Sequence, residues 1–207
     1  MTRPSKRSSA KDTKARISEV AIGLLIRHGL RGMSYDMIAK KLEITTTNIH
    51  YHFGSKDRLV HSVVEQYVGE ASAKHSSIWR ADGLTLQEKI QAAREFNRRR
   101  HARFNSPTSG GQPWSLIARM RLEGDAVPSD TQHFLQDFAN GLRDDIHFAV
   151  YRAKESGELR TEVPEADVAK LLTGIVYGSA VFTQMTGSFD GMEEIYDAFW
   201  AVVAGKS

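Results

Sequence analysis

Hydrophobic residues in the first part of the chain repeat with the period of an amphipathic helix. Ile17, Val20, Ala21, Leu24 and Leu25 fall at positions i, i+3, i+4, i+7 and i+8. This helix is predicted to end at residues 28–29, because a glycine preceded by a histidine is typical of a helix C-terminus.

Two short helices and a longer one are predicted next. Ser34 is a favourable N-cap for a helix that reaches residue 42, and Thr45 for a helix over about 46–53. Residues 43–44 form the tight turn between them. Ser55 then begins a longer helix, in which apolar residues recur as far as residue 67.

After residue 80 the pattern remains helical. We predict helices over roughly 85–104, 114–123, 130–156, 165–187 and 191–204, separated by segments that contain glycine. No set of strands is evident. The sequence therefore predicts an all-α protein.

The charge is distributed unevenly along the 207 residues. Residues 1–60 carry twelve Lys or Arg against five Asp or Glu, a net charge of +7, whereas residues 61–207 have a net charge of −4. A basic segment of this kind indicates a polyanionic partner. The chain has no cysteine, no signal-peptide core and no apolar run long enough to span a bilayer. We therefore expect a soluble cytoplasmic protein with no membrane partner.

The two short helices and the three-residue turn between them form a helix-turn-helix pattern within the basic region. Thr46, Thr47, His50 and Tyr51 occupy the outward positions of the second helix. Hydroxyl and imidazole groups can bond to base edges or phosphates without adding negative charge. The alternative is a structural helical hairpin with a polar outer face.

The residues of this segment resemble a known family. The matching positions are Ile38, Ala39, Ile44, Thr45, Ile49, Tyr51, Phe53, Lys56 and Leu59. Their pattern resembles the DNA-binding segment of the TetR family of transcriptional regulators, in detail over residues 12 to about 70. Elsewhere the resemblance is limited to length, helical character and the final pair of helices.

The resemblance implies that eight residues contact DNA. Ser34 and Tyr35 would bond phosphates, Thr45 would cap the recognition helix, and Lys56 would hold a phosphate. Thr46, Thr47, His50 and Tyr51 would face the major groove or its flanking phosphates.

Three residues depart from the family pattern. Glu43 stands where the family has a glycine in the turn, and a left-handed conformation there would be strained. His50 replaces a tyrosine. Asn48 replaces a threonine and would either support the helix or read an adenine.

Other motifs give little support to catalysis or metal binding. The histidines lack metal-ligand spacing, and the sequence has no nucleophile elbow, phosphate-binding loop or catalytic carboxylate pair. We expect no enzyme activity, no metal and no cofactor. The arginine-rich segment 97–103 is interpreted as a solvated face with carboxylate partners rather than a second nucleic-acid patch.

The C-terminal helices are expected to bind an effector and to form a homodimer. Candidates for an apolar effector pocket are Phe96, Phe104, Trp114, Arg119, Phe138 and Tyr177. Candidates for the dimer interface are Gly174, Gly178, Val181, Phe182, Phe199 and Trp200. Most aromatic residues are expected simply to pack in the core.

The predicted organisation has three parts. Residues 1–11 are a flexible basic arm, residues 12–71 a helix-turn-helix DNA-binding domain with its motif at about 34–53, and residues 72–207 an effector-binding and dimerisation domain. The sequence therefore predicts a transcriptional repressor that binds double-stranded operator DNA and is released by a hydrophobic or aromatic effector. The alternative is a nonspecific architectural DNA-binding protein without an effector.

Overall fold

The described residues form an elongated, all-helical protein. The computed structural model describes residues 6–106 and 110–205, and within them it contains no β-sheet. The helices are α1 (Lys6–Gly32), α2 (Tyr35–Leu42), α3 (Thr46–Phe53), α4 (Lys56–Trp79), α5 (Leu86–Ala102), α6 (Leu116–Glu123), a short 3-10 helix (Gly124–Ala126), α7 (Ser129–Glu155), α8 (Glu165–Thr186) and α9 (Asp190–Val203). The all-α prediction is confirmed.

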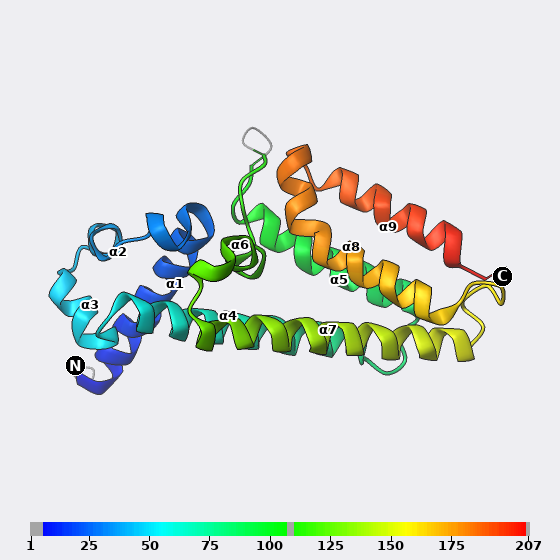
Figure 1. Ribbon diagram of the computed structural model, residues 1–207, viewed down its shortest axis with the longest axis horizontal. Coiled ribbons are helices and arrows are strands. Elements are labelled where there is room, and N and C mark those ends of the chain that lie inside the picture. Colours follow the sequence, from blue (N-terminus) through cyan, green and yellow to red (C-terminus); the bar gives the residue numbers. More distant parts are fainter. Residues whose placement is uncertain (1–5, 107–109, 206–207) are drawn as a thin grey trace, which may run out of the picture.

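Helices α1 to α3 gather at one end of the molecule and the remaining helices form a bundle behind them (Figure 1). Helix α4 leaves the N-terminal group and packs along α7, which in turn packs against α8. Helices α5, α8 and α9 complete the bundle. The long α4 therefore connects the N-terminal group directly to the bundle core.

Part of the predicted N-terminal arm is helical. Helix α1 begins at Lys6, so residues 6–11 are helical rather than flexible, and residues 1–5 lie outside the described residues. The predicted break at residues 28–29 is present as a kink, since Gly29 has a left-handed φ of 70° and ψ of −173°. The chain then continues for one short turn to Gly32 before α2 begins.

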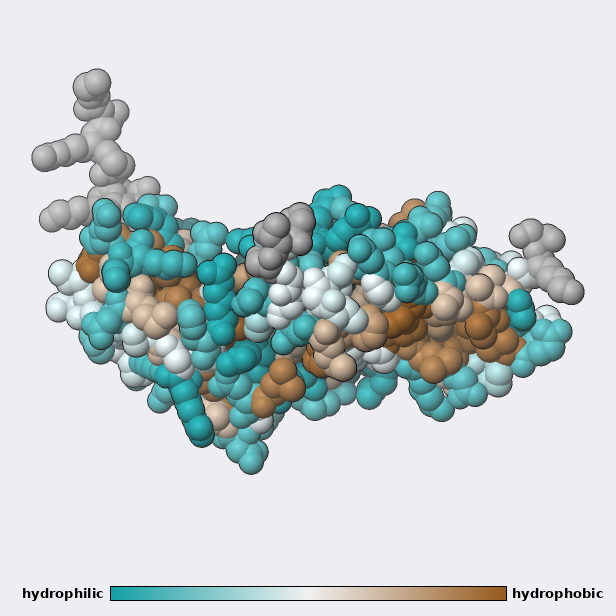
Figure 2. Space-filling view, turned by 90° about the horizontal axis from the view of Figure 1, so that it is seen from above, coloured by the Kyte–Doolittle hydropathy of each residue, from teal (hydrophilic) through white to brown (hydrophobic). Residues whose placement is uncertain are grey.

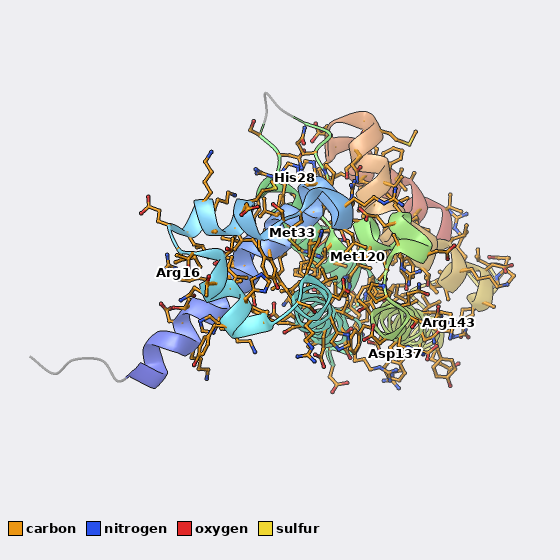
Figure 3. All side chains as sticks on the ribbon, turned by 60° about the vertical axis from the view of Figure 1, so that its left-hand side comes forward. Arg16, His28, Met33, Met120, Asp137 and Arg143 are labelled. Atoms are coloured by element: carbon orange, nitrogen blue, oxygen red, sulfur yellow. The ribbon has the colours of Figure 1, made fainter. Side chains whose placement is uncertain are left out.

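The kink brings the N-terminal group against α6. Met33, just after α1, and Met120 of α6 are both fully buried, and Figure 3 shows them on the two sides of this junction. Helix α1 packs against both α4 and α6. The N-terminal helices therefore rest on two elements of the bundle.

Hydrophobic contacts between α4 and α7 form the centre of the bundle core. Val63, Val64 and Trp79 of α4 are buried, as are Leu142 and Ile146 of α7. Side chains spaced three and four apart on one helix face the partner helix.

None of the helices in the described part of the chain is long and apolar enough to cross a membrane.

Candidate nucleic-acid interface and internal cavities

Side-chain caps fix the ends of the two short helices. The Ser34 hydroxyl accepts a hydrogen bond from the Met37 N–H (3.4 Å), and the Thr45 hydroxyl accepts one from the Asn48 N–H (3.2 Å). Each hydroxyl proton remains available to an outside acceptor. The two caps thus start α2 and α3 at the predicted positions and leave both hydroxyls able to donate to a phosphate.

The turn between α2 and α3 adopts the left-handed conformation despite its glutamate. Glu43 has φ 56° and ψ 42° and is the sole non-glycine residue with positive φ among the described residues. The Glu43 N–H donates to the Ala39 carbonyl. Buried Ile38 and Ile49 hold the two helices together across the turn. The fold therefore keeps the geometry of a helix-turn-helix and places strain on Glu43.

The outer face of α3 is polar and accessible. Thr47, His50 and Tyr51 are exposed, with 82% of Tyr51 accessible, and Thr46 is partly buried. No residue of α3 is acidic. Lys56, partly buried in the first turn of α4, lies just beyond. These side chains form one surface that presents hydroxyl, imidazole and ammonium groups.

Tyr35 and His50 pack against each other on this surface. Their ring centroids are 4.7 Å apart in an edge-to-face arrangement, and His50 Nδ1 donates to the Gly54 carbonyl at 2.6 Å. Because Nδ1 makes this hydrogen bond, Nε2 is the ring nitrogen of His50 that remains free. The Tyr35 hydroxyl is covered and has no hydrogen-bond partner, and burial together with Asp57 raises the pKa of this group. Tyr35 therefore does not present its predicted phosphate donor at the surface in this structure.

The aromatic residues predicted to bind an effector line two adjacent cavities. Phe96, Phe104 and Trp114 line a cavity of about 730 Å³ between α1, α4 and α5. Phe138 and Tyr177 line a second cavity of about 50 Å³ inside the bundle. Arg100 and Trp114 line both, so the two cavities share a wall.

Arg119 lies elsewhere, at the contact between α6 and α1. Its Nε donates to Glu123 Oε1 at 2.9 Å, and Glu123 Oε2 accepts the Leu30 N–H at 3.0 Å. A Cβ atom on Gly29 would meet the Glu123 carboxyl group at 1.8 Å. Arg119 therefore supports the kink of α1 and lines neither cavity, which corrects its predicted role.

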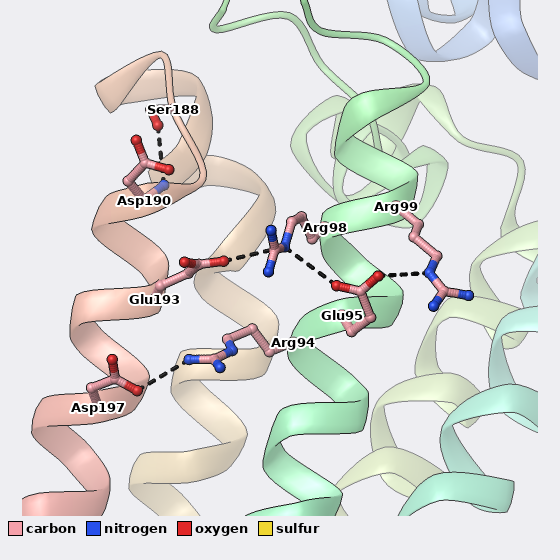
Figure 4. A network of polar contacts seen from close by, with 8 residues as sticks. All are labelled: Arg94, Glu95, Arg98, Arg99, Ser188, Asp190, Glu193 and Asp197. Carbon is pink, nitrogen blue, oxygen red and sulfur yellow. Dashed lines mark hydrogen bonds and ion pairs between the residues drawn. The ribbon is translucent and has the colours of Figure 1, made fainter. Parts of the chain in front are cut away.

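Three of the four arginines in residues 97–103 lie on a solvated face. Figure 4 shows Arg98 paired with Glu95 and Glu193, and Arg99 paired with Glu95. Arg103 pairs with Glu19 of α1. Arg100 instead points into the cavities, a role that the sequence interpretation missed. The spacing Phe96–Arg100–Phe104, four apart, is the signal that places it on the aromatic face of α5.

The predicted dimer residues divide between the surface and the core. Gly174, Gly178 and Val181 are exposed along α8, together with Leu171 and Met185. Figure 2 shows hydrophobic side chains gathered on the half of the molecule that holds α8 and α9. Phe199 is buried within the subunit and offers little surface to a partner, and Phe182 and Trp200 are only partly exposed.

Comparisons with known proteins match both the N-terminal helices and the whole fold. Residues 17–63 match the family model of bacterial regulatory proteins, tetR family. A transcriptional regulator of the TetR family from Agrobacterium tumefaciens is 21% identical, with a TM-score of 0.81 over 95% of this chain and 100% of that one. A TetR transcriptional regulator from Chloroflexus aurantiacus is 18% identical, with a TM-score of 0.75 over 96% and 100%.

One similar structure contains nucleic acid. The TetR family transcriptional regulator CifR, complexed with a 26-base-pair double-strand operator DNA, is 17% identical, with a TM-score of 0.68 over 98% of this chain and 99% of that one. None of the curated proteins matches this chain. The solved structures therefore establish a shared fold at low sequence identity.

Proposed function

We propose that this protein is a sequence-specific DNA-binding transcriptional regulator, a repressor released by a small organic molecule, because residues 17–63 match the family model of bacterial regulatory proteins, tetR family. The resemblance inferred from residues 38–59 is confirmed by this match. The observation that carries the proposal is the accessible, acid-free outer face of α3, held by the Ser34 and Thr45 caps.

The proposed contacts divide into two kinds. Thr47 and Tyr51 project from α3 and are proposed to read bases in the major groove, whereas Lys56 and the capping hydroxyls of Ser34 and Thr45 bind phosphates. Thr46 and the free Nε2 of His50 flank this surface. Tyr35 is proposed to position His50 rather than to bond a phosphate itself.

Selection of bound sequences from a random duplex pool tests this assignment. A specific regulator enriches one imperfect palindrome, because a two-fold dimer binds two half-sites about one helical turn apart or slightly more. Thr47→Ala should change the base preference at one position of each half-site. Lys56→Ala should weaken all sequences alike and reduce the salt slope by about one unit.

Lys170→Ala is the matched control, since Lys170 is exposed on α8, far from α3. It removes the same charge and should leave both affinity and salt slope unchanged. Equal affinity for every duplex would contradict sequence recognition and support the architectural alternative.

Homodimerisation is proposed through the exposed face of α8 and its neighbour α9. Leu171, Gly174, Gly178, Val181 and Met185 follow one another at alternating spacings of three and four, so they form one stripe on α8. Small residues in this stripe allow two helices to approach closely. A dimer built on it would hold the two α3 helices on one duplex.

The effector site is proposed in the larger cavity. Its walls come from α1 on one side and from α4 and α5 on the other, so a bound molecule would contact both the DNA-binding helices and the bundle. A ligand that prefers the DNA-free arrangement weakens DNA binding by the same factor by which DNA weakens ligand binding, typically about 5–150-fold. DNA-binding anisotropy measured with and without ligand tests this reciprocity.

A further inference from the structure

We infer that the effector is an organic anion, an apolar or aromatic body that carries a carboxylate or a similar acidic group, and that Arg100 is the residue that recognises its charge. This inference rests on the proposed ligand-controlled function and specifies the chemistry of its ligand. It is carried by the surroundings of Arg100 in the wall between the two cavities.

Arg100 has aromatic partners and no carboxylate partner among the described residues. Its guanidinium lies over the rings of Tyr67 (4.9 Å to the centroid), Phe96 (5.2 Å) and Trp114 (5.6 Å). The neighbouring Arg98 and Arg99 are exposed and paired with glutamates, whereas Arg100 is partly buried. A guanidinium withdrawn from water normally requires an anion or several acceptors. Arg100 therefore stands ready to pair with an anion brought from outside.

The Tyr67 hydroxyl adds a second donor at the same place. Its oxygen accepts hydrogen bonds from Arg100 Nη2 and from the Leu116 N–H. Its own proton has no acceptor in the part of the chain that the structure describes. A carboxylate beside Arg100 would accept from both the guanidinium and this hydroxyl, and charge-assisted bonds of this kind are the strongest in proteins.

No acidic side chain lines the smaller cavity behind Arg100. Its lining contains Arg121 and His75 but no aspartate or glutamate. His75 Nδ1 and the Tyr177 hydroxyl are buried without a hydrogen-bond partner. Burial and the charge of Arg100 lower the pKa of His75 to about 4 against the opposing effect of Asp145, so Arg100 acts on a group that lines this cavity. A lining that contains two arginines and no carboxylate favours an anionic ligand.

The larger cavity has room for the apolar body. Its lining carries more positive than negative charge, because Arg27, Lys41, Lys74, Arg100 and Arg103 face only two glutamates. Of these, Glu19 pairs with Arg103, and Glu70 accepts a hydrogen bond from the neutral Gln66. Phe96, Phe104 and Trp114 supply aromatic wall on either side of Arg100. A volume of about 730 Å³ lies in the range that encloses a drug-sized molecule. The ligand class is therefore an amphipathic acid rather than an inorganic anion.

Two fluorescent dyes that differ by a single sulfonate group test the inference. Anilinonaphthalene sulfonate carries an acidic group, and phenylnaphthylamine has the same aromatic body without it. The wild-type protein should bind the sulfonate at least about tenfold more tightly, the value of one charge-assisted hydrogen bond. Arg100→Gln should remove this preference and leave phenylnaphthylamine affinity within about twofold, because the apolar walls remain. Arg100→Lys, which keeps the charge without the planar fork, should retain part of it.

Arg99→Gln is the matched control, since it removes the same charge one residue away on the solvated face. It should bind both dyes as the wild-type protein does. The inference is overturned if the wild-type protein shows no preference for the sulfonate, if neither dye binds, or if Arg100→Gln weakens both dyes equally, which would mark a structural role. If the preference depends on Arg100 but the sulfonate leaves DNA affinity unchanged, anion recognition stands and the proposed ligand control of DNA binding fails.

Discussion

Glu43 occupies a backbone conformation that side chains other than glycine seldom adopt. The left-handed conformation costs a non-glycine residue about 1–2 kcal/mol. Replacement by glycine removes this cost, but the greater freedom of glycine in the unfolded chain offsets about 0.5–1 kcal/mol of the gain. Glu43→Gly should therefore raise the free energy of unfolding by up to about 1 kcal/mol, measured by urea denaturation. A loss of stability would contradict the strain at this turn.

Glu43→Gln is the control that separates strain from charge. It keeps a side chain in the left-handed conformation and should leave stability near that of the wild-type protein. Because Glu43 is exposed between the two motif helices, removal of its charge should strengthen DNA binding modestly in both variants. A gain confined to Glu43→Gly would assign the effect to backbone geometry instead.

His75 makes stability depend on pH. Burial first and Arg100 second lower its pKa from 6.5 to about 4, against the opposing effect of Asp145. Between these two values the unfolded chain takes up a proton that the folded chain does not, so stability falls as the pH falls. The loss between pH 8 and pH 5 should be about 2 kcal/mol in urea denaturation.

His75→Phe should reduce this pH dependence, because phenylalanine fits the aromatic contacts with Phe96 and Phe138 and does not titrate. His133→Phe is the matched control, since His133 is exposed on the same α7 helix that carries Phe138. An unchanged slope in His75→Phe would show that other groups cause the acid sensitivity.

Among the individual residues, the sequence predicted those whose role is local. The Ser34 and Thr45 caps depend on residues three positions away and lie where the pattern placed them. Arg100 was assigned to a solvated face together with Arg98 and Arg99, since consecutive arginines look alike in a sequence. The structure gives them different roles, because α9 places Glu193 beside Arg98 and α4 places the Tyr67 ring beside Arg100. Long-range packing decides such roles.

At the scale of elements, the contact between α6 and the kink of α1 joins the two parts of the protein. The Glu123 carboxylate, 16% exposed, accepts the Leu30 N–H and the Arg119 guanidinium. Glu123→Ala leaves a partly buried N–H without a partner and should lower the free energy of unfolding by about 1–3 kcal/mol. It should also reduce the effect of a ligand on DNA affinity, because α6 then holds α1 less firmly.

Glu95→Ala provides a matched control for Glu123→Ala. Glu95 also pairs with an arginine four residues away, but on the exposed face of α5, so its loss should destabilise the protein much less than the loss of Glu123. Equal destabilisation by the two variants would show that the contact with Leu30 contributes nothing beyond a surface ion pair.

The order and approximate limits of the helices were predictable because each depends on periodicity and local breaks. Helix α7, predicted over 130–156, spans Ser129–Glu155. Residues 6–11 were assigned to a flexible arm but are helical, because lysine and serine near an N-terminus are compatible with either helix or coil. Glu123 supports the kink at Gly29 by accepting a hydrogen bond from the Leu30 N–H, and Leu30 and Glu123 are 93 residues apart in the sequence. No local pattern contains that pairing.

At the scale of the whole molecule, the exposed stripe on α8 is an apolar surface that one chain leaves unpacked. Leu171 is 58% exposed, Val181 41% and Met185 80%. Gly174 and Gly178 lie between them, and a Cβ atom at either glycine would meet no heavy atom within 4 Å. A larger side chain at these positions therefore does not disturb the subunit itself. This separates an effect on the dimer from an effect on the core.

Gly178→Leu should yield a folded monomer. Within the subunit the substitution replaces a poor helix former and should stabilise α8 by up to about 1 kcal/mol. Across a two-fold interface the leucine would meet its own copy and hold the helices apart. Sedimentation velocity should show a shift from dimer to monomer with unchanged helical circular dichroism, and affinity for a palindromic site should fall because the second half-site is lost.

Gly141→Leu is the matched control, because Gly141 lies in α7, is also exposed and also has open space around its Cβ position. It changes the same residue type in a helix outside the proposed seam and should remain dimeric. A dimeric Gly178→Leu variant with full affinity for the palindrome would place the interface elsewhere on the molecule, and a monomeric Gly141→Leu variant would move it to α7.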